Sequence, residues 1–405
     1  MSRTLLLLAA LSTASSLPAA TGLKTTARLE AGREPVRIVC VGDSITGIYY
    51  HTGSRRAYPE LLELALRRLY PRAELTVFNA GLSGDSTTGA LVRLDRDVIA
   101  RQPHLVTVMF GMNDVVKIPL ADFQRNLREI CARVRQAGAE VLLCTQNTVT
   151  ETEARPSARL AEYTQAIRDL AREDSIGLVD VHASFAALQA AQPEAWSLLS
   201  SDEIHPGMHG HRRFTSAIAE AISGKAISLA DVGPPTPSLP HTFARLREGK
   251  PVKVLAMPPL DQIIAPALRQ IYPQAEVTVT SWPTDGRTMA QLEASAKEVR
   301  AQAMDLVLIA IPPQATAENP AKYQWHYNWI MNWSLNFGPP SWDVVALPPS
   351  TISPQLNADE QELDQLARVL IAGKDLPTLS RSSGDRAPLA ALLATWLAAQ
   401  PLTSP

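Results

Sequence analysis

Strand-like and helix-like segments alternate along the first half of the chain, and this alternation limits the fold more than any other feature. Short apolar runs between residues 37 and 220 are each followed by apolar residues at helical spacing. We expect strands at residues 37–41, 75–78, 104–110, 141–144 and 177–180, and helices at residues 58–70, 91–101, 123–137, 160–172 and 208–222. Repeated β-α units bury both faces of a parallel sheet, so the sequence predicts an α/β fold: a three-layer α/β/α sandwich with a mostly parallel sheet.

An internal repeat indicates a second domain. Residues 65–77 recur as residues 267–279, with nine of the 13 positions identical. Two further strand-like runs recur at nearly the same offset: residues 105–110 as 306–311, and 141–144 as 344–347. We therefore expect the fold to be duplicated in a second, smaller domain over residues 251–400. Residues 226–250, which contain a Pro-rich stretch, are the predicted linker.

Four short polar blocks stand where the predicted fold would bring them together. The first three follow successive predicted strands, and the fourth precedes the last predicted helix: Gly42-Asp43-Ser44, residues 79–86, Gly111-Met112-Asn113, and residues 202–206. Ligand sites in open parallel sheets lie at the carboxyl ends of the strands. The sequence thus predicts one site at one rim of the sheet.

Taken in order, the four blocks resemble those of the SGNH (GDSL) hydrolases, a family of serine esterases, over residues 35–225. The resemblance implies a flavodoxin-like catalytic domain at residues 30–225. It implies that Ser44 is the nucleophile, that His205 is the base and that Asp202 orients His205. The implied oxyanion hole consists of the main-chain N–H groups of Ser44 and Gly84 and the side chain of Asn113. Beside these residues, we expect Asp43 and Asn79 to support the site, with Asn79 bracing the oxyanion loop.

The chemistry of such a set needs no cofactor. A serine hydroxyl becomes a useful nucleophile when an imidazole takes its proton, and the carboxylate fixes the imidazole tautomer. His205, His209 and His211 are close in sequence, and the alternative interpretation is that they bind a metal. No carboxylate or thiol nearby completes a recognisable spacing of metal ligands. We predict neither a metal nor an organic cofactor.

The second copy does not retain these chemical groups. Alignment of the repeat puts Pro259 in the place of Ser44 and Gln314 in that of Asn113. Thr351 and Pro354 fall where Asp202 and His205 stand, and Gly286 alone matches its counterpart, Gly84. We predict that residues 251–400 are a degenerate, non-catalytic copy.

Two segments leave alternatives open. His51 and Arg55 follow the nucleophile in a long loop and either bind polar substrate or belong to a solvated loop. Trp325, Trp329 and Trp333 recur every four residues, which places them on one face of a helix. That face is a core or interdomain surface in one reading, and a saccharide platform or a lid over the site in the other.

The N-terminus has the pattern of a secretory signal peptide over residues 1–22: one positive charge, a short apolar core and small residues at the exit. The apolar run is too short to span a bilayer, so we expect no membrane segment after cleavage. We expect an exported protein, periplasmic or extracellular. The formal charge of −2 and the lack of a basic cluster argue against nucleic acid. The three cysteines are expected to be buried and free.

Taken together, these features predict an exported serine esterase for small-molecule or polysaccharide esters, with O-acetylated carbohydrate as the favoured subclass. A lipase, thioesterase or lysophospholipase of the same family is the alternative among enzymes. A non-catalytic carbohydrate-binding protein, working through the aromatic face of the second domain, is the alternative outside enzymes. The oligomeric state stays open.

Overall fold

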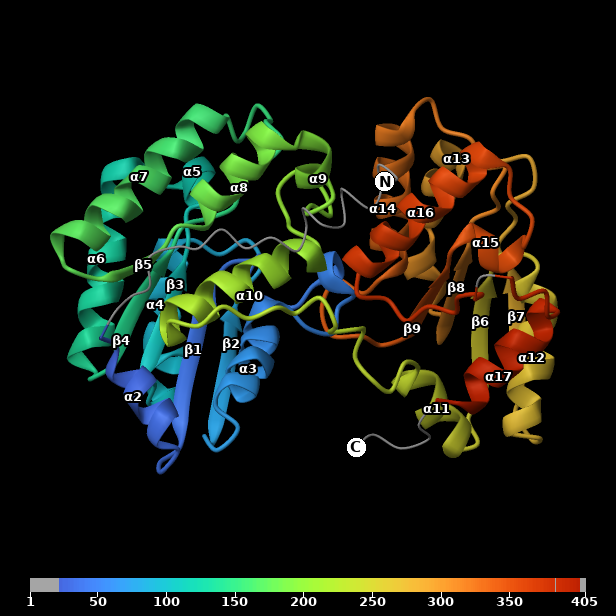
Figure 1. Cartoon of the computed structure of the whole chain (residues 1–405), viewed down its shortest axis with the longest axis horizontal. Helices are drawn as coiled ribbons and strands as arrows, with labels where there is room; N and C mark the ends of the chain where they lie inside the picture. The colour runs from blue at the N-terminus through green and yellow to red at the C-terminus, as the bar shows by residue number, and fades with distance from the viewer. Residues whose placement is uncertain (1–21, 383, 401–405) are drawn as a thin grey trace. The chain divides into compact units, whose positions relative to one another are not determined.

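The computed structural model describes residues 22–382 and 384–400, so all but the last residue of the predicted signal peptide lies outside the described residues. The described residues form two compact units. The first comprises the chain up to Ile48 and Arg56–Val232, and the second comprises Tyr49–Arg55 and the chain from Gly233 onward. Each unit contains one sheet and is described by itself (Figure 1).

Five parallel strands form the sheet of the first unit in the order β2-β1-β3-β4-β5. Their bounds are β1 Val36–Gly42, β2 Leu75–Gly81, β3 Leu105–Met109, β4 Glu140–Cys144 and β5 Gly177–Val179. Residues of the central strand β3 are all buried, as expected for a strand covered on both faces. The predicted strands and their parallel arrangement are confirmed.

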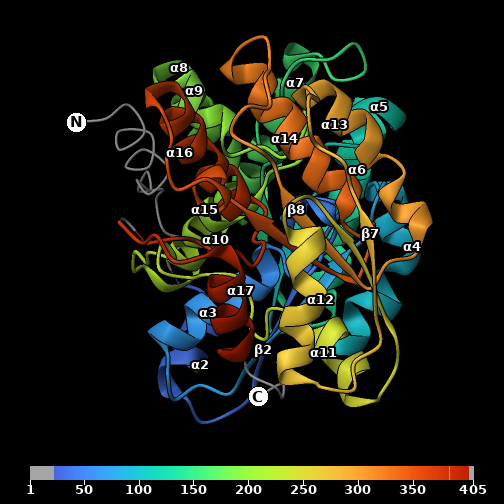
Figure 2. The ribbon, with the colours of Figure 1, turned by 90° about the vertical axis from the view of Figure 1, so that its right-hand side faces the viewer.

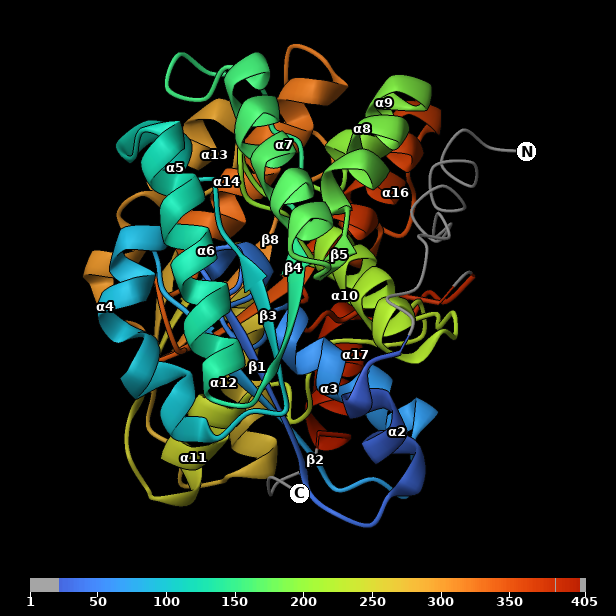
Figure 3. The same cartoon turned by 90° about the vertical axis from the view of Figure 1, so that its left-hand side faces the viewer.

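Helices cover both faces of this sheet (Figure 3). One apolar layer joins the sheet to α2 (Lys24–Ala31), α3 (Tyr58–Leu69), α8 (Val181–Ala191) and α10 (Met208–Ser223). The other joins it to α4 (Thr87–Asp97), α6 (Leu120–Gln136) and α7 (Ser157–Glu173). Three shorter elements complete the unit: η2 (Ile99–Arg101), α5 (Asp114–Lys117) and α9 (Pro193–Ser197). The prediction of a three-layer α/β/α sandwich is confirmed.

One predicted helix boundary was wrong. The helix expected at residues 91–101 begins at Thr87 and ends at Asp97, and a separate 3-10 turn, η2, follows it. The Asp114 carboxylate accepts a hydrogen bond from the Thr87 main-chain N–H at 2.9 Å, which satisfies a donor of the first turn. That partner lies 27 residues along the chain, whereas the local N-cap residue, Ser86, makes no side-chain capping hydrogen bond.

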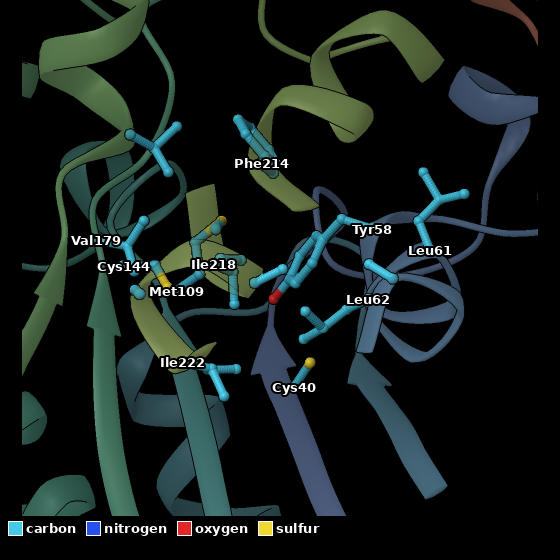
Figure 4. Packing of buried hydrophobic residues seen from close by; sticks show 14 of the residues in the cluster. Cys40, Tyr58, Leu61, Leu62, Met109, Cys144, Val179, Phe214, Ile218 and Ile222 are labelled. Atoms are coloured by element: carbon cyan, nitrogen blue, oxygen red, sulfur yellow. The ribbon is translucent and has the colours of Figure 1, made fainter. Parts of the chain in front are cut away.

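Aromatic and aliphatic side chains of α3 and α10 meet the strands in the first apolar layer (Figure 4). Tyr58 and Phe214 pack edge to face, with 6.1 Å between ring centroids. All three cysteines are buried and free, as predicted. Burial raises the pKa of the Cys40 thiol to about 12, so this group stays a neutral apolar packing element.

The second unit has four parallel strands in the order β7-β6-β8-β9. Their bounds are β6 Val252–Ala256, β7 Val277–Ser281, β8 Leu306–Ala310 and β9 Asp343–Leu347. The pairing registers follow the sequence repeat: Val36 pairs with Leu75 in the first sheet, and Val252 with Val277 in the second. Leu105 likewise pairs with Glu140, and the corresponding Leu306 with Asp343. The two sheets thus share their strand order and their register over four strands.

Helices flank the second sheet as well, and in Figure 2 α12 (Leu260–Ile271) lies beside α17 (Leu389–Ala398), and α13 (Met289–Ala296) beside α14 (Pro320–Ser334). The remaining elements of the unit are α11 (Pro240–Arg247), η3 (Val299–Gln302), α15 (Pro349–Ile352), α16 (Ala358–Gly373) and η1 (Tyr50–Thr52). Helix α11 lies inside the predicted linker of residues 226–250 and begins with Pro240, whose fixed φ suits a first helical turn. Within the described residues, no helix has the length and apolarity needed to cross a membrane.

The tryptophans of α14 contact one another and Arg300 within the second unit. Trp329 and Trp333 are tilted against each other with 5.4 Å between ring centroids, and the Arg300 guanidinium lies 5.1 Å from the Trp333 ring. Arg300 also lies 5.3 Å from the ring of Tyr50. Arg300 therefore covers one face of Trp333, while all three tryptophans stay half-buried. The choice between a packing surface and a saccharide platform or lid stays a prediction.

Candidate active site

A tight turn places Ser44 immediately after β1. The main-chain N–H groups of Thr46 and Gly47 both donate to the Asp43 carbonyl oxygen at 3.1 Å. Gly42, the last residue of β1, has no room for a side chain, because a Cβ there would lie 2.7 Å from the Met109 carbonyl oxygen. This close approach holds the nucleophile turn against the end of β3. The Ser44 side chain is largely buried, with 7% of the residue exposed.

The loop that carries Asp202 and His205 is organised by its own carboxylate. Oδ1 of Asp202 accepts the main-chain N–H groups of Ile204 at 3.0 Å and His205 at 2.8 Å. The Asn147 amide, in the loop that follows β4, donates to the Ile204 carbonyl oxygen at 3.0 Å. Short-range hydrogen bonds therefore fix the geometry of the Asp-x-x-His segment before α10 begins.

The three side chains predicted as a triad lie in a line of hydrogen bonds. Ser44 Oγ is 2.9 Å from His205 Nε2, and His205 Nδ1 is 2.9 Å from Asp202 Oδ2. Since a carboxylate only accepts, Nδ1 carries the proton, and Nε2 presents a lone pair to the serine hydroxyl. The geometry matches a general base poised to deprotonate Ser44, although 161 residues separate the two along the chain.

The two other predicted oxyanion donors lie on neighbouring loops. Nδ2 of Asn113 donates to the Asp85 carbonyl oxygen at 2.9 Å, which ties the third block to the second. Gly84 has a φ of +71°, a left-handed conformation that favours glycine, and Lys117 Nζ donates to its carbonyl oxygen at 2.6 Å. Their role toward an oxyanion stays a prediction.

Asn79, predicted as a supporting residue, contacts two loops of the site. Its Nδ2 donates to the Thr46 carbonyl oxygen at 2.9 Å and to Glu60 Oε1 at 3.1 Å. Its Oδ1 accepts the main-chain N–H of Gly81 at 3.0 Å. One side chain thus braces the nucleophile turn against the start of the loop that carries Gly84.

The candidate substrate-binding residues His51 and Arg55 lie in the short segment that packs with the second unit. His51 is buried in η1, with 4% of the residue exposed. Arg55 Nη1 donates to the Pro235 carbonyl oxygen at 2.8 Å. The expectation of a solvated loop is wrong for His51, because its ring is enclosed. A role for either residue in substrate binding stays a prediction.

Sequence reasoning missed a buried ion pair beneath the site. Arg93 on α4 binds the Asp85 carboxylate at 2.7 Å, and both side chains are less than a tenth exposed. The same guanidinium donates to the carbonyl oxygens of Ala80 and Gly42 at 2.8 and 3.0 Å. It therefore joins the ends of β1 and β2, and nothing in the local sequence around Arg93 signals partners so far along the chain.

Of the histidines considered for a metal site, His211 has a packing role. Its Nδ1 accepts the Tyr58 main-chain N–H at 2.9 Å, across the contact between α3 and α10. Burial is the largest cause that lowers the pKa of His211 to about 3, so its ring stays neutral. The Nδ1 lone pair of His211 is therefore occupied by the hydrogen bond from Tyr58 and cannot also bind a metal ion.

Asp43 is buried next to the nucleophile, and its carboxyl group bears on stability. Its Oδ1 accepts the Ile45 main-chain N–H at 2.9 Å, but burial raises the pKa of Asp43 from its ordinary value of 3.8 to about 7. An unfolded chain releases this proton near pH 4, whereas the folded protein holds it until about pH 7. The folded state binds more protons in that window, so stability falls as the pH rises through it.

We expect Asp43→Asn to remove the fall in stability with rising pH, because an amide keeps the Oδ1 acceptor and cannot ionise. The free energy of unfolding should then vary less between pH 4 and 7, and at pH 8 it should exceed the wild-type value by up to roughly 4 kcal/mol, the equivalent of the change from 3.8 to about 7. Urea unfolding across that range measures the effect, with exposed Asp174→Asn as the control. A parallel pH profile for Asp43→Asn and wild type would contradict it.

The first unit is a parallel α/β sandwich with a serine, an imidazole and a carboxylate at one rim of the sheet. Residues 40–213 match the GDSL-like lipase/acylhydrolase family.

Among relatives, the chain is 26% identical over 209 residues to an acetylxylan esterase of Geobacillus stearothermophilus, covering 46% of this chain and 93% of that protein. It is 29% identical over 114 residues to an arylesterase of Vibrio mimicus, covering 28% of this chain and 56% of that protein. Among solved structures it is similar to a lipase/acylhydrolase from Enterococcus faecalis, with 24% identity, a TM-score of 0.41 and coverage of 47% of this chain and 97% of that one.

Proposed function

We propose that the first unit is a serine esterase that hydrolyses acyl esters through an acyl-enzyme intermediate. The hydrogen-bonded line from Ser44 through His205 to Asp202 is the observation that carries the proposal. The match of residues 40–213 to the GDSL-like lipase/acylhydrolase family supports ester hydrolysis as the reaction.

Each residue has a defined part in the proposed reaction. His205 takes the hydroxyl proton as Ser44 Oγ bonds to the ester carbonyl carbon, and the carbonyl electron pair moves onto the oxyanion. His205 returns the proton to the leaving alcohol when the C–O bond breaks, which leaves Ser44 acylated. Water then attacks the acyl-enzyme by the same route and releases the acid. The N–H groups of Ser44, Gly84 and Asn113 stabilise the oxyanion in both steps.

As the substrate subclass we favour O-acetylated carbohydrate. Similarity to an acetylxylan esterase over 93% of that protein's length supports this choice. We expect acetylated xylo-oligosaccharides and p-nitrophenyl acetate to be cleaved, with kcat/KM falling as the acyl chain lengthens from acetate to octanoate. Rates on a matched acyl series measure the preference. A maximum at octanoate or longer would instead favour the lipase or lysophospholipase alternative.

For the second unit we propose a degenerate copy with a structural or binding role. Its sheet repeats the strand order and register of the first. That register matches Val36 with Val252, so Leu260, one residue after the predicted Pro259, holds the place of Ser44. Leucine carries no nucleophile. We further propose that the chain is exported through its N-terminal segment, which the mass of the mature N-terminus would test.

A further inference from the structure

Arg155 is a basic side chain at the rim of the first sheet that the motifs do not account for. It lies between β4 and α7, in a tight turn where its main-chain N–H donates to the Thr152 carbonyl oxygen at 3.0 Å and to Thr152 Oγ1 at 3.2 Å. An isolated antiparallel bridge joins the same two residues. The backbone that carries the guanidinium is therefore held in place.

The guanidinium reaches the loop that carries Asn113. Arg155 Nε donates to the Met112 carbonyl oxygen at 3.0 Å, and Nη2 donates to Asn113 Oδ1 at 3.3 Å. These contacts span 43 and 42 residues of chain. Two donors of one planar fork thus bind adjacent acceptors, which sets both the distance and the orientation of the group.

Two contacts, from Arg155 and to the Asp85 carbonyl oxygen, fix which way the Asn113 amide points. Arginine has donors only, so the amide atom that faces it must be the oxygen. Nδ2 is then directed to the other side, where one of its hydrogens is donated to the Asp85 carbonyl oxygen at 2.9 Å. The second Nδ2 hydrogen remains for an acceptor in the site. Without Arg155, the hydrogen bond to the Asp85 carbonyl oxygen would be the remaining restraint on the amide, and an amide that turned over would present its oxygen, which repels an oxyanion.

Burial strengthens the hydrogen bond between Arg155 and Asn113. Asn113 is 7% exposed, and desolvation lowers the pKa of Arg155 while the carboxylates of Asp43 and Asp202 raise it. Hydrogen bonds from a charged donor in partly buried surroundings are stronger than neutral ones. The cationic group also lies in the same rim as the acids of the site, which offsets their charge.

We propose that Arg155 is a positioning residue of the oxyanion hole, holding the Asn113 amide with its N–H toward the reacting carbonyl. This inference rests on the proposed esterase function and adds a residue to it. Because Asn113 would bind the oxyanion only in the transition state, Arg155 should affect kcat and leave KM nearly unchanged.

The test is a double-mutant cycle with p-nitrophenyl acetate on the full chain. We expect Arg155→Ala to lower kcat roughly 10- to 100-fold, the range for losing a hydrogen bond to a charged group, with KM changed less than about twofold. We expect Asn113→Ala to lower kcat by ~10²–10³. In the Asn113→Ala background, Arg155→Ala should cost little more, since the group it positions is already absent. Exposed Arg159→Ala on the next helix is the matched control and should keep the wild-type rate.

Arg155→Lys distinguishes the effect of the planar pair of guanidinium donors from the effect of the positive charge. Lysine keeps a positive charge but lacks the planar pair of donors, so we expect it to recover only part of the lost rate and to supply the answer if Arg155→Ala does not fold. Equal losses from Arg155→Ala in both backgrounds, or a wild-type rate for Arg155→Ala or Arg155→Lys, would overturn the positioning role. Activity that survives both Asn113→Ala and Ser44→Ala would instead contradict the proposed function itself.

Discussion

Replacing Ser44 with alanine will reduce ester hydrolysis by about 10⁴- to 10⁶-fold, to the level that binding and the remaining oxyanion donors can supply. Ser44 Oγ is the hydroxyl that would form the acyl bond, and the base that would deprotonate it, His205 Nε2, lies 2.9 Å away. Since Ser44 is small and lies in a turn held by main-chain hydrogen bonds, the variant should fold. Steady-state rates on p-nitrophenyl acetate measure the loss.

A matched serine controls for nonspecific effects of the substitution. Ser197 is on α9 in the same unit, and Ser197→Ala should keep the wild-type rate. Equal thermal unfolding midpoints for the two variants would show that the loss at Ser44 is chemical. If Ser44→Ala retains more than a tenth of the activity, another group is the nucleophile and the proposed mechanism is wrong.

Asp202→Asn is the second large effect we expect, with kcat lowered by roughly 10⁴. An amide can keep the Oδ1 acceptor for the main-chain N–H groups of Ile204 and His205, so the loop should retain its shape. Its nitrogen, however, can donate to His205 Nδ1, which would move the ring proton to Nε2. The imidazole would then present an N–H to Ser44 and could not accept the hydroxyl proton.

The loss should shrink as the pH rises, because hydroxide can then deprotonate the serine without the imidazole. The pH profile of kcat between 6 and 10 is therefore the informative measurement, with unfolding midpoints as the check on the fold. A variant with a wild-type rate at neutral pH would show that Asp202 does not set the tautomer of His205. A loss that stays constant across the profile would argue that the carboxylate acts in some other way.

The parts of the site that sequence could predict are those carried by local patterns. Ser44 follows an apolar run that forms β1, and Asp202 and His205 stand three residues apart, which lets one carboxylate bond both the ring and the main chain of its own loop. The parallel arrangement of the strands follows from β-α alternation, since parallel strands need crossover helices. The repeat also predicted three of the four strands of the second sheet, β7, β8 and β9.

What sequence could not predict depends on contacts between distant segments. Helix α4 begins at Thr87 because Asp114, 27 residues later, accepts its main-chain N–H. Arg93 and Arg155 look like ordinary surface arginines in sequence, yet the fold directs each to main-chain carbonyl oxygens of the site loops. The helix inside the predicted linker was missed for a different reason: Pro240 was read as a helix breaker, whereas at a first turn it favours a helix.

Covalent labelling with a fluorophosphonate tests the central claim most directly, because the reagent reacts with a serine only when a neighbouring base activates it. We predict one adduct per chain by intact mass, located by peptide mapping on the segment that contains Ser44, and no adduct in His205→Ala. An adduct within residues 251–400, or an active protein that takes up no label at Ser44, would contradict the assignment of this serine as the nucleophile.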